Sequence, residues 1–206
     1  MKYNFYAGPA ILPREVIEES AKALLDFKGM GLSLIEISHR TKEFIAVMDE
    51  AVALTRELLG INEDHEVLFL AGGASLQFAM VPMNLLDETQ SAAYTDTGTW
   101  ASKAIKDGKL YGKVDVIASS KDKNYSYIPK GYVVDPSYRY LHITTNNTIF
   151  GTQYKKLPDT EVPLVADMSS DIFSREFDIN RFDLIYAGAQ KNMGPAGTTL
   201  VVVRKS

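Results

Sequence analysis

The sequence contains no cysteine, which excludes disulfide bonds and thiolate metal sites from its 206 residues. It has no uninterrupted apolar run long enough to span a bilayer, and residues 1–16 lack the apolar segment of a secretory signal peptide. The formal net charge of -4 argues against nucleic acid or an anionic membrane as a partner. We therefore expect a cytoplasmic chain.

Two common phosphate-binding patterns are missing as well. Residues 70–78 read as a strand, a turn at Gly72 and Gly73, and the start of a helix, but they match neither GxGxxG nor GxxxxGK[ST]. This mismatch argues against a dinucleotide or nucleoside-triphosphate site. Free amides at the start of such a helix can still bind a phosphate group, although most glycine turns of this kind bind nothing.

What is present is an ordinary globular composition, 46% apolar and 23% charged. Helical periodicity predicts helices after Pro13, from about 42 to 59, from 76 to 86 and from 100 to 109. Seven short apolar runs predict strands at residues 67–70, 92–95, 114–118, 140–144, 163–166, 184–187 and 199–203. Because runs without polar alternation indicate burial on both faces, we expect an α/β fold with a mostly parallel seven-stranded sheet.

The last predicted strand lies next to the end of the sequence, with only Arg204 and Lys205 between its apolar residues and Ser206. A central strand in that place, with no closing element, is typical of a fragment or truncated chain. An edge strand at a natural C-terminus is the alternative.

A lysine in a glycine-rich segment is the first candidate for chemistry. Lys191 stands within residues 186–197, where Gly188, Gly194 and Gly197 would let a ligand approach the backbone closely. A lysine that forms a Schiff base must be accessible, partly desolvated and held near its cofactor. For this residue alone, a solvated lysine on a surface loop is the simpler interpretation.

The second candidate is Asp167, which ends the apolar run 163–166. Open α/β sheets bind ligands at the carboxyl ends of their strands, and Lys191 follows the next run, so we expect both side chains at one edge. An aspartate there can keep a pyridine nitrogen protonated, but it is equally suited to cap a helix.

Two further segments supply an aromatic ring and a basic pair. Trp100, the only tryptophan, follows the run 92–95 and can stack on a flat heteroaromatic ring, although core packing is the more common use of tryptophan. His39 and Arg40 lie between two predicted helices, where they can bind an anionic substrate or simply be solvated. Each of these features is a weak signal by itself. The phosphate cup, the aromatic ring, the acid and the lysine together indicate a binding site.

The chain resembles the phosphoserine aminotransferase family, within the class-V, fold-type-I enzymes that use pyridoxal 5'-phosphate (PLP). Matching motifs extend over essentially the whole chain, at residues 7–10, 38–40, 72–74, 98–100, 147–149 and 166–170. The most specific is YAGAQKNMGPAG at 186–197, which distinguishes this family from cysteine desulfurases and other class-V relatives. The resemblance implies an N-terminal arm at 1–15 and a three-layer, aspartate aminotransferase-like PLP-binding large domain at 16–206.

The resemblance also implies amino transfer between O-phospho-L-serine and 2-oxoglutarate, giving 3-phosphohydroxypyruvate and L-glutamate in serine biosynthesis, by a homodimer. Lys191 would be the Schiff-base lysine and general acid/base, and Asp167 the partner of the pyridine nitrogen. The other implied contacts are ring stacking by Trp100, phosphate binding by the amides of Ala74 and Ser75, ring or phosphate contacts by Thr148 and Gln190, and substrate-anion binding by His39 and Arg40.

Three departures from the family pattern leave alternatives open. Ser75 stands where many members carry a substrate-binding arginine, and Ala7 where some carry a serine. The family's C-terminal small domain, which holds an arginine for the substrate α-carboxylate, is expected to be absent from this chain. The alternatives are another class-V PLP enzyme and a large domain that folds without turnover.

Overall fold

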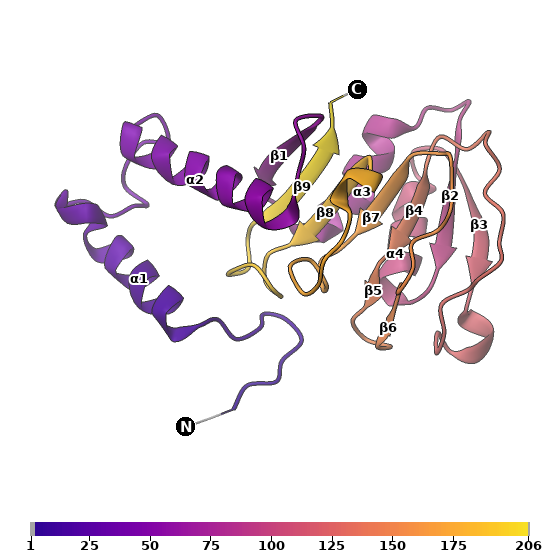
Figure 1. The fold of residues 1–206 in the computed structure, drawn as a ribbon, viewed down its shortest axis with the longest axis horizontal. Coiled ribbons are helices and arrows are strands. Elements are labelled where there is room, and N and C mark those ends of the chain that lie inside the picture. Colours follow the sequence, from indigo (N-terminus) through magenta and orange to yellow (C-terminus); the bar gives the residue numbers. More distant parts are fainter. Residues whose placement is uncertain (1–2, 206) are drawn as a thin grey trace.

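The computed structural model describes residues 3–205 and begins with two helices that confirm the predicted ones. They are α1 (Arg14–Leu25) and α2 (Lys42–Leu59). The side chain of Thr41 caps α2 by accepting a hydrogen bond from the Phe44 amide, and Gly60 ends it in the left-handed conformation. α1 buries none of its residues and, with the short helix η1 (Phe27–Gly29), lies apart from the sheet (Figure 1).

Seven strands form one sheet in the order β1-β9-β8-β7-β4-β2-β3. Neighbours from β3 to β8 are parallel, whereas β9 is antiparallel to both β8 and β1. The predicted mostly parallel sheet is therefore confirmed, with β9 as an interior strand. The strands are β1 (His65–Leu70), β2 (Ser91–Asp96), β3 (Lys113–Ser119), β4 (Leu141–Thr144), β7 (Leu164–Asp167), β8 (Leu184–Gly188) and β9 (Thr199–Arg204).

The expected burial on both faces holds for the central strands and is wrong for the edges. Every residue of β4, β7 and β8 is buried, whereas β1 and β3 include exposed positions. The physical reason is that the covering layers end at the margins of the sheet, so an edge strand keeps one face partly in water.

The layers on the two faces of the sheet have separate cores. On one face, α3 (Gly73–Leu85) and α4 (Thr99–Gly108) cover a cluster that includes Phe78, Tyr94 and Tyr186. On the other face, Val52 and Leu59 of α2 pack against a second cluster, which contains Ile143, Met168, Ile172 and Phe182. The sheet therefore lies between two helical layers, as expected.

A small hairpin after β4 was not predicted. It consists of β5 (Asn146–Asn147) and β6 (Thr152–Gln153), paired antiparallel. The hairpin lies close to the start of α4. A side chain at Gly98 would meet Asn147 Oδ1 at 2.9 Å and Phe150 at 3.2 Å. The glycine at that position therefore lets the hairpin approach α4 closely.

Candidate active site

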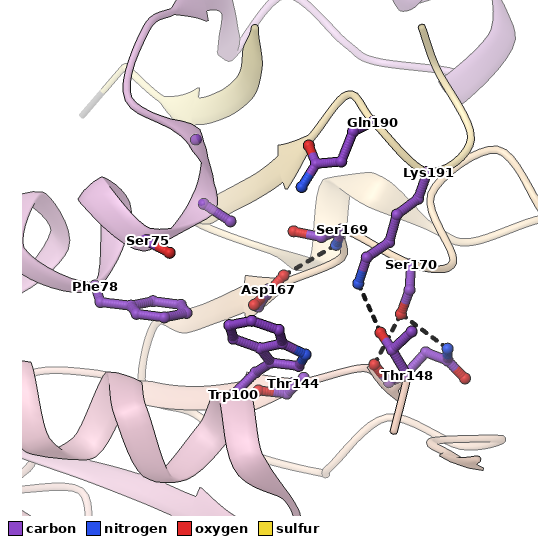
Figure 2. Close-up of a pocket in the computed structure, with 13 residues that line it drawn as sticks. Ser75, Phe78, Trp100, Thr144, Thr148, Asp167, Ser169, Ser170, Gln190 and Lys191 are labelled. Atoms are coloured by element: carbon purple, nitrogen blue, oxygen red, sulfur yellow. Dashed lines mark hydrogen bonds between the residues drawn. The ribbon is translucent and has the colours of Figure 1, made fainter. Parts of the chain in front are cut away.

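A pocket opens at the carboxyl ends of β4 and β7, beside the first turns of α3 and α4 (Figure 2). All the residues predicted to contact the cofactor line it, together with several that were not predicted. The predicted ones are Ala74, Ser75, Trp100, Thr148, Asp167, Gln190 and Lys191; the others are Gly73, Phe78, Thr144, Asn146, Ser169 and Ser170. The sequence motifs are thus brought together from five separate parts of the chain.

Lys191 extends from the loop after β8 into this pocket, where its Nζ donates a hydrogen bond of 2.6 Å to Thr148 Oγ1. The same nitrogen lies 5.9 Å from the centroid of the Trp100 ring. Burial lowers the pKa of Lys191, while the charges of Asp167 and Asp171 oppose that shift. Burial therefore favours the neutral amine, which is the form that attacks an aldehyde.

Asp167 ends β7 and lies in register with Thr144 of β4 and Tyr186 of β8. Its side chain is buried, and Oδ1 accepts a hydrogen bond of 2.9 Å from the Ser169 amide. Burial raises the pKa of Asp167, and the hydrogen bonds from Ser169 and the charge of Lys191 oppose that shift. A turn rather than a helix follows Asp167, so the helix-cap alternative is excluded.

The start of α3 forms the end of the pocket that was predicted to bind a phosphate. Gly72 has φ of 95°, and a side chain there would come within 2.4 Å of Leu76, so this turn requires glycine. The N-cap position is occupied by Gly72, which has no side chain to cap the helix. The first amides of α3, including those of Ala74 and Ser75, are consequently available to an anion at the positive end of the helix dipole.

Two buried atoms in the pocket wall lack hydrogen-bond partners within residues 3–205. They are Trp100 Nε1 and Thr144 Oγ1. Unsatisfied buried groups are uncommon in folded proteins, and a bound polar ligand is one way to satisfy them. With free amides, an indole, a buried acid and an amine in one cavity, the residues present fit a phosphorylated pyridine aldehyde such as PLP.

Aromatic and histidine side chains support the floor of the pocket beneath Asp167. His142 Nε2 and the Tyr186 hydroxyl are hydrogen bonded at 2.8 Å, and the His142 ring stacks on Tyr94 with centroids 4.7 Å apart. Tyr94 and Tyr140 share a hydrogen bond of 2.7 Å. Burial lowers the pKa of His142 to about 3 and raises the pKa of Tyr94 to about 12, so both are neutral at ordinary pH.

His39 and Arg40 do not line the Lys191 pocket. His39 lies in a different hollow, which it shares with Phe44, Phe69 and Thr198. Both basic residues are exposed. Their predicted role in substrate binding stays a prediction, because within this chain they are not part of the cavity that holds the lysine.

The N-terminal segment contacts the lysine loop, and no pattern in the sequence predicted this contact. The Ala10 amide donates a hydrogen bond of 2.8 Å to the Gln190 carbonyl. A side chain at Gly8 would come within 3.2 Å of Lys191 Cγ. The motif at residues 7–10 was noted in the sequence, but nothing in its residue types indicates which distant loop it contacts.

The fold and this cavity define a class. The protein-family model described as Aminotransferase class-V matches residues 2–206 of the sequence. The chain therefore belongs to that family of PLP-dependent enzymes. Within it, the chain is similar to phosphoserine aminotransferases. The curated protein of that name from Flavobacterium psychrophilum is 62% identical over 205 residues, which are 99% of this chain and 58% of the relative.

Solved structures agree with this assignment. Phosphoserine aminotransferase from Bacillus circulans subsp. alkalophilus is 52% identical, with a TM-score of 0.95 over 98% of this chain and 57% of that one. The PLP-bound phosphoserine aminotransferase from Trichomonas vaginalis is 36% identical, with a TM-score of 0.91 over 98% of this chain and 58% of that one. This chain therefore spans a little under three fifths of the length of these relatives. Among the residues described, no helix is both long and apolar enough to cross a membrane.

Proposed function

We propose that the chain binds PLP through Lys191 and Asp167, and that it serves amino transfer between phosphoserine and 2-oxoglutarate. The observation that carries the proposal is the shared pocket: the Lys191 amine, the Asp167 carboxylate, the Trp100 indole and the open amides of α3 all line it. The similarity to phosphoserine aminotransferases supports the choice of substrates.

The residues divide the work of holding the cofactor. The amides of Ala74 and Ser75 would bind its phosphate, and Trp100 would lie against its ring. Asp167 would hold a proton at the pyridine nitrogen, which burial makes favourable because the carboxylate then gains an opposite charge in a dry site. When bound, PLP supplies an electron sink for the carbanion that forms at the substrate Cα.

Lys191 has two tasks in this proposal. Its Nζ would hold the cofactor covalently at the aldehyde carbon, and as a free amine it would serve as the general acid/base for the proton at the substrate Cα. Thr148 and Gln190 would contact the cofactor ring or phosphate from the sides of the pocket. The hydrogen bond from Lys191 to Thr148 supports this arrangement, since it aims the amine into the cavity.

Substrate binding calls on the basic pair. His39 and Arg40 would bind the distal phosphate or carboxylate of the substrate through charge-assisted hydrogen bonds. Because they lie outside the Lys191 pocket of their own chain, we propose that a second copy of the chain presents them, in a homodimer. A cytoplasmic location belongs to the same proposal, and cell fractionation would test it.

The test measures cofactor binding and turnover separately. Purified chain is mixed with PLP and scanned for the visible absorbance band of PLP attached to a lysine. Phosphoserine and 2-oxoglutarate are then added, and glutamate formation is followed. Both signals are expected. Turnover of other amino donors but not of phosphoserine would replace the proposed substrate with that of another class-V enzyme.

A second candidate follows from the position of the basic pair and from the length of the relatives. If the band appears and glutamate does not, this chain is a cofactor-binding large domain without turnover. That result would retain the assignment of Lys191 and Asp167 and reject transamination by the 206 residues alone.

A further inference from the structure

The β5–β6 hairpin carries Thr148, the hydrogen-bond acceptor of Lys191, at its turn. A hairpin with two-residue strands has little intrinsic stability, so its position depends on what holds its two ends. One end is Thr145, just before β5. The other is Gln153, the last residue of β6, with Tyr154 directly after it. Whatever fastens these residues therefore determines where Thr148 meets the lysine.

Asp171 fastens both ends of the hairpin. Its side chain is 1% exposed and is not among the residues lining the pocket. Oδ1 accepts a hydrogen bond of 2.5 Å from Thr145 Oγ1, and Oδ2 accepts one of 3.4 Å from Gln153 Nε2. One buried carboxylate thus joins the residue that precedes the hairpin to the residue that closes it.

Arg175 completes this clamp from the same turn. Its Nη2 lies 3.3 Å from Asp171 Oδ2 and donates a hydrogen bond of 2.6 Å to the Tyr154 carbonyl. The guanidinium also lies 3.9 Å from the Phe177 ring centroid. The second end of the hairpin is therefore held twice, through Gln153 and through the backbone of Tyr154.

The clamp is also joined to the acid of the pocket. Thr145 donates two hydrogen bonds to the Asp167 carbonyl, at 3.0 Å from its amide and 3.1 Å from its hydroxyl. The hydroxyl of one threonine is thus shared between the backbone of Asp167 and the carboxylate of Asp171. A change at Asp171 consequently reaches the hairpin and the end of β7 together.

We propose that Asp171 is a positioning residue, which holds Thr148 against Lys191 by fastening both ends of the β5–β6 hairpin. The inference deepens the proposed function, on which its catalytic meaning rests. Its structural content concerns only contacts within this chain.

Substitution of Asp171 by asparagine breaks the clamp with little change of size. An asparagine oxygen can still accept from Thr145, but the amide group then faces two donors, Gln153 and Arg175. The charged groups around the lysine are Asp167 and Asp171, and Arg175 faces Asp171. Loss of a negative charge and loss of the Thr148 acceptor both disfavour the ammonium form, so both lower the pKa of Lys191.

The experiment measures that pKa by acetylating the cofactor-free chain across a pH series and quantifying the Lys191 peptide by mass spectrometry. We expect the pH of half-maximal acetylation of Lys191, its midpoint, to fall by roughly one pH unit in D171N. At any pH well below both midpoints, the neutral fraction of the lysine is then about tenfold larger in the variant. The matched control is D183N, which removes an acid bonded to Leu164 and Arg204 instead. D183N should leave the Lys191 midpoint unchanged.

A double-mutant cycle separates positioning from charge. T148V removes the acceptor itself and should lower the midpoint as D171N does. If Asp171 acts by placing Thr148, the D171N/T148V double variant shifts the Lys191 midpoint by clearly less than the sum of the two single shifts, because only the charge part of the D171N effect adds to that of T148V. Full additivity, or a D171N midpoint equal to that of D183N, would overturn the proposal.

Folding is controlled by a milder variant. Q153M loosens one end of the hairpin without leaving Arg175 unpaired, and it should give a smaller shift in the same direction. An unchanged midpoint in Q153M together with an unfolded D171N would also count against the clamp. The Lys191 midpoint is measured on the cofactor-free chain, so it can be determined whether or not the chain binds PLP. Failure to bind PLP would therefore count against the proposed function alone.

Discussion

Asp167 at the end of β7 and Asp171 in the turn after it are both buried acids, yet they face different surroundings. Asp167 lines the pocket, and an amide donates to its carboxylate at 2.9 Å. The Asp171 carboxylate lies outside the pocket and is satisfied by Thr145, Gln153 and Arg175. We call the pocket lining around Asp167 the pocket-facing side, because its polar groups can still bind a ligand. We call Asp171 and its partners the supporting side, because the hydrogen-bonding capacity of that carboxylate is already used by the protein.

On the pocket-facing side, the largest effect is expected from K191A. Without the amine no covalent attachment is possible, so the visible band of lysine-bound PLP should disappear completely. K103A is the control, because Lys103 lies 4.5 Å from the Trp100 ring but does not line the pocket. Absorbance scans of both variants with added PLP check this, and a band that survives in K191A would remove Lys191 from its role.

The two acids should then differ in kind. D167N removes the charge proposed to hold a proton on the pyridine nitrogen, and we expect turnover to fall roughly 100- to 1000-fold. D171N should cost less, because it displaces a neighbour of the reacting groups rather than a contact to the cofactor. Steady-state rates at saturating PLP measure both. Equal losses in the two variants would break the distinction between the two sides.

His142, beneath the floor of the pocket, should control the stability of the chain in acid. Its pKa is about 3 in the folded chain against 6.5 unfolded, so between these values the unfolded chain binds a proton that the folded chain does not. Stability is therefore lost as the pH falls, by about 3 kcal/mol from pH 7 to pH 4. Urea unfolding at both pH values measures it.

The matched variant for that experiment is H142F, which keeps a ring beside Tyr94 and cannot titrate. It should be less stable at pH 7, since the Tyr186 hydroxyl loses its partner, but its stability should depend less on pH by the same amount. Parallel pH profiles for H142F and the unaltered chain would contradict the assignment of acid sensitivity to this histidine.

The smallest effect is expected where the N-terminal segment touches the lysine stem. G8A places a methyl group 3.2 Å from Lys191 Cγ. This crowding should lower the free energy of unfolding by about 1 kcal/mol and slow PLP attachment about fivefold. G194A is the control in the same loop, because a side chain there meets no atom within 4 Å among the described residues. Stopped-flow absorbance of both variants gives the rates, and equal rates would show that the stem can move aside.

The pocket-facing side was the part that the sequence predicted well. Runs of apolar residues located all seven strands, and the motifs around Asp167 and Lys191 located two walls of the pocket. The strands could be predicted from the local pattern of apolar residues. The pocket walls could be predicted because an acid or a lysine at the end of a buried strand has few roles other than ligand binding. The order of the strands, with β9 antiparallel inside the sheet, needs contacts that no local pattern contains.

The supporting side could not be predicted for the same reason. The β5–β6 hairpin has strands of two residues, too short for a periodic signal. Asp171 reads as an ordinary turn acid until Gln153 and Arg175 are seen beside it. The basic pair at His39 and Arg40 shows the opposite limit: residue type indicated a binding role, but the pocket that it would serve lies elsewhere in the chain.

The assignment of Lys191 as the cofactor lysine is tested by chemical trapping of the bound cofactor. The chain is loaded with PLP, reduced with borohydride and digested, and the peptide that carries the added mass is sequenced by mass spectrometry. We predict one modified residue per chain, Lys191. Modification of a different lysine, or no modification at all, would contradict the assignment of the pocket.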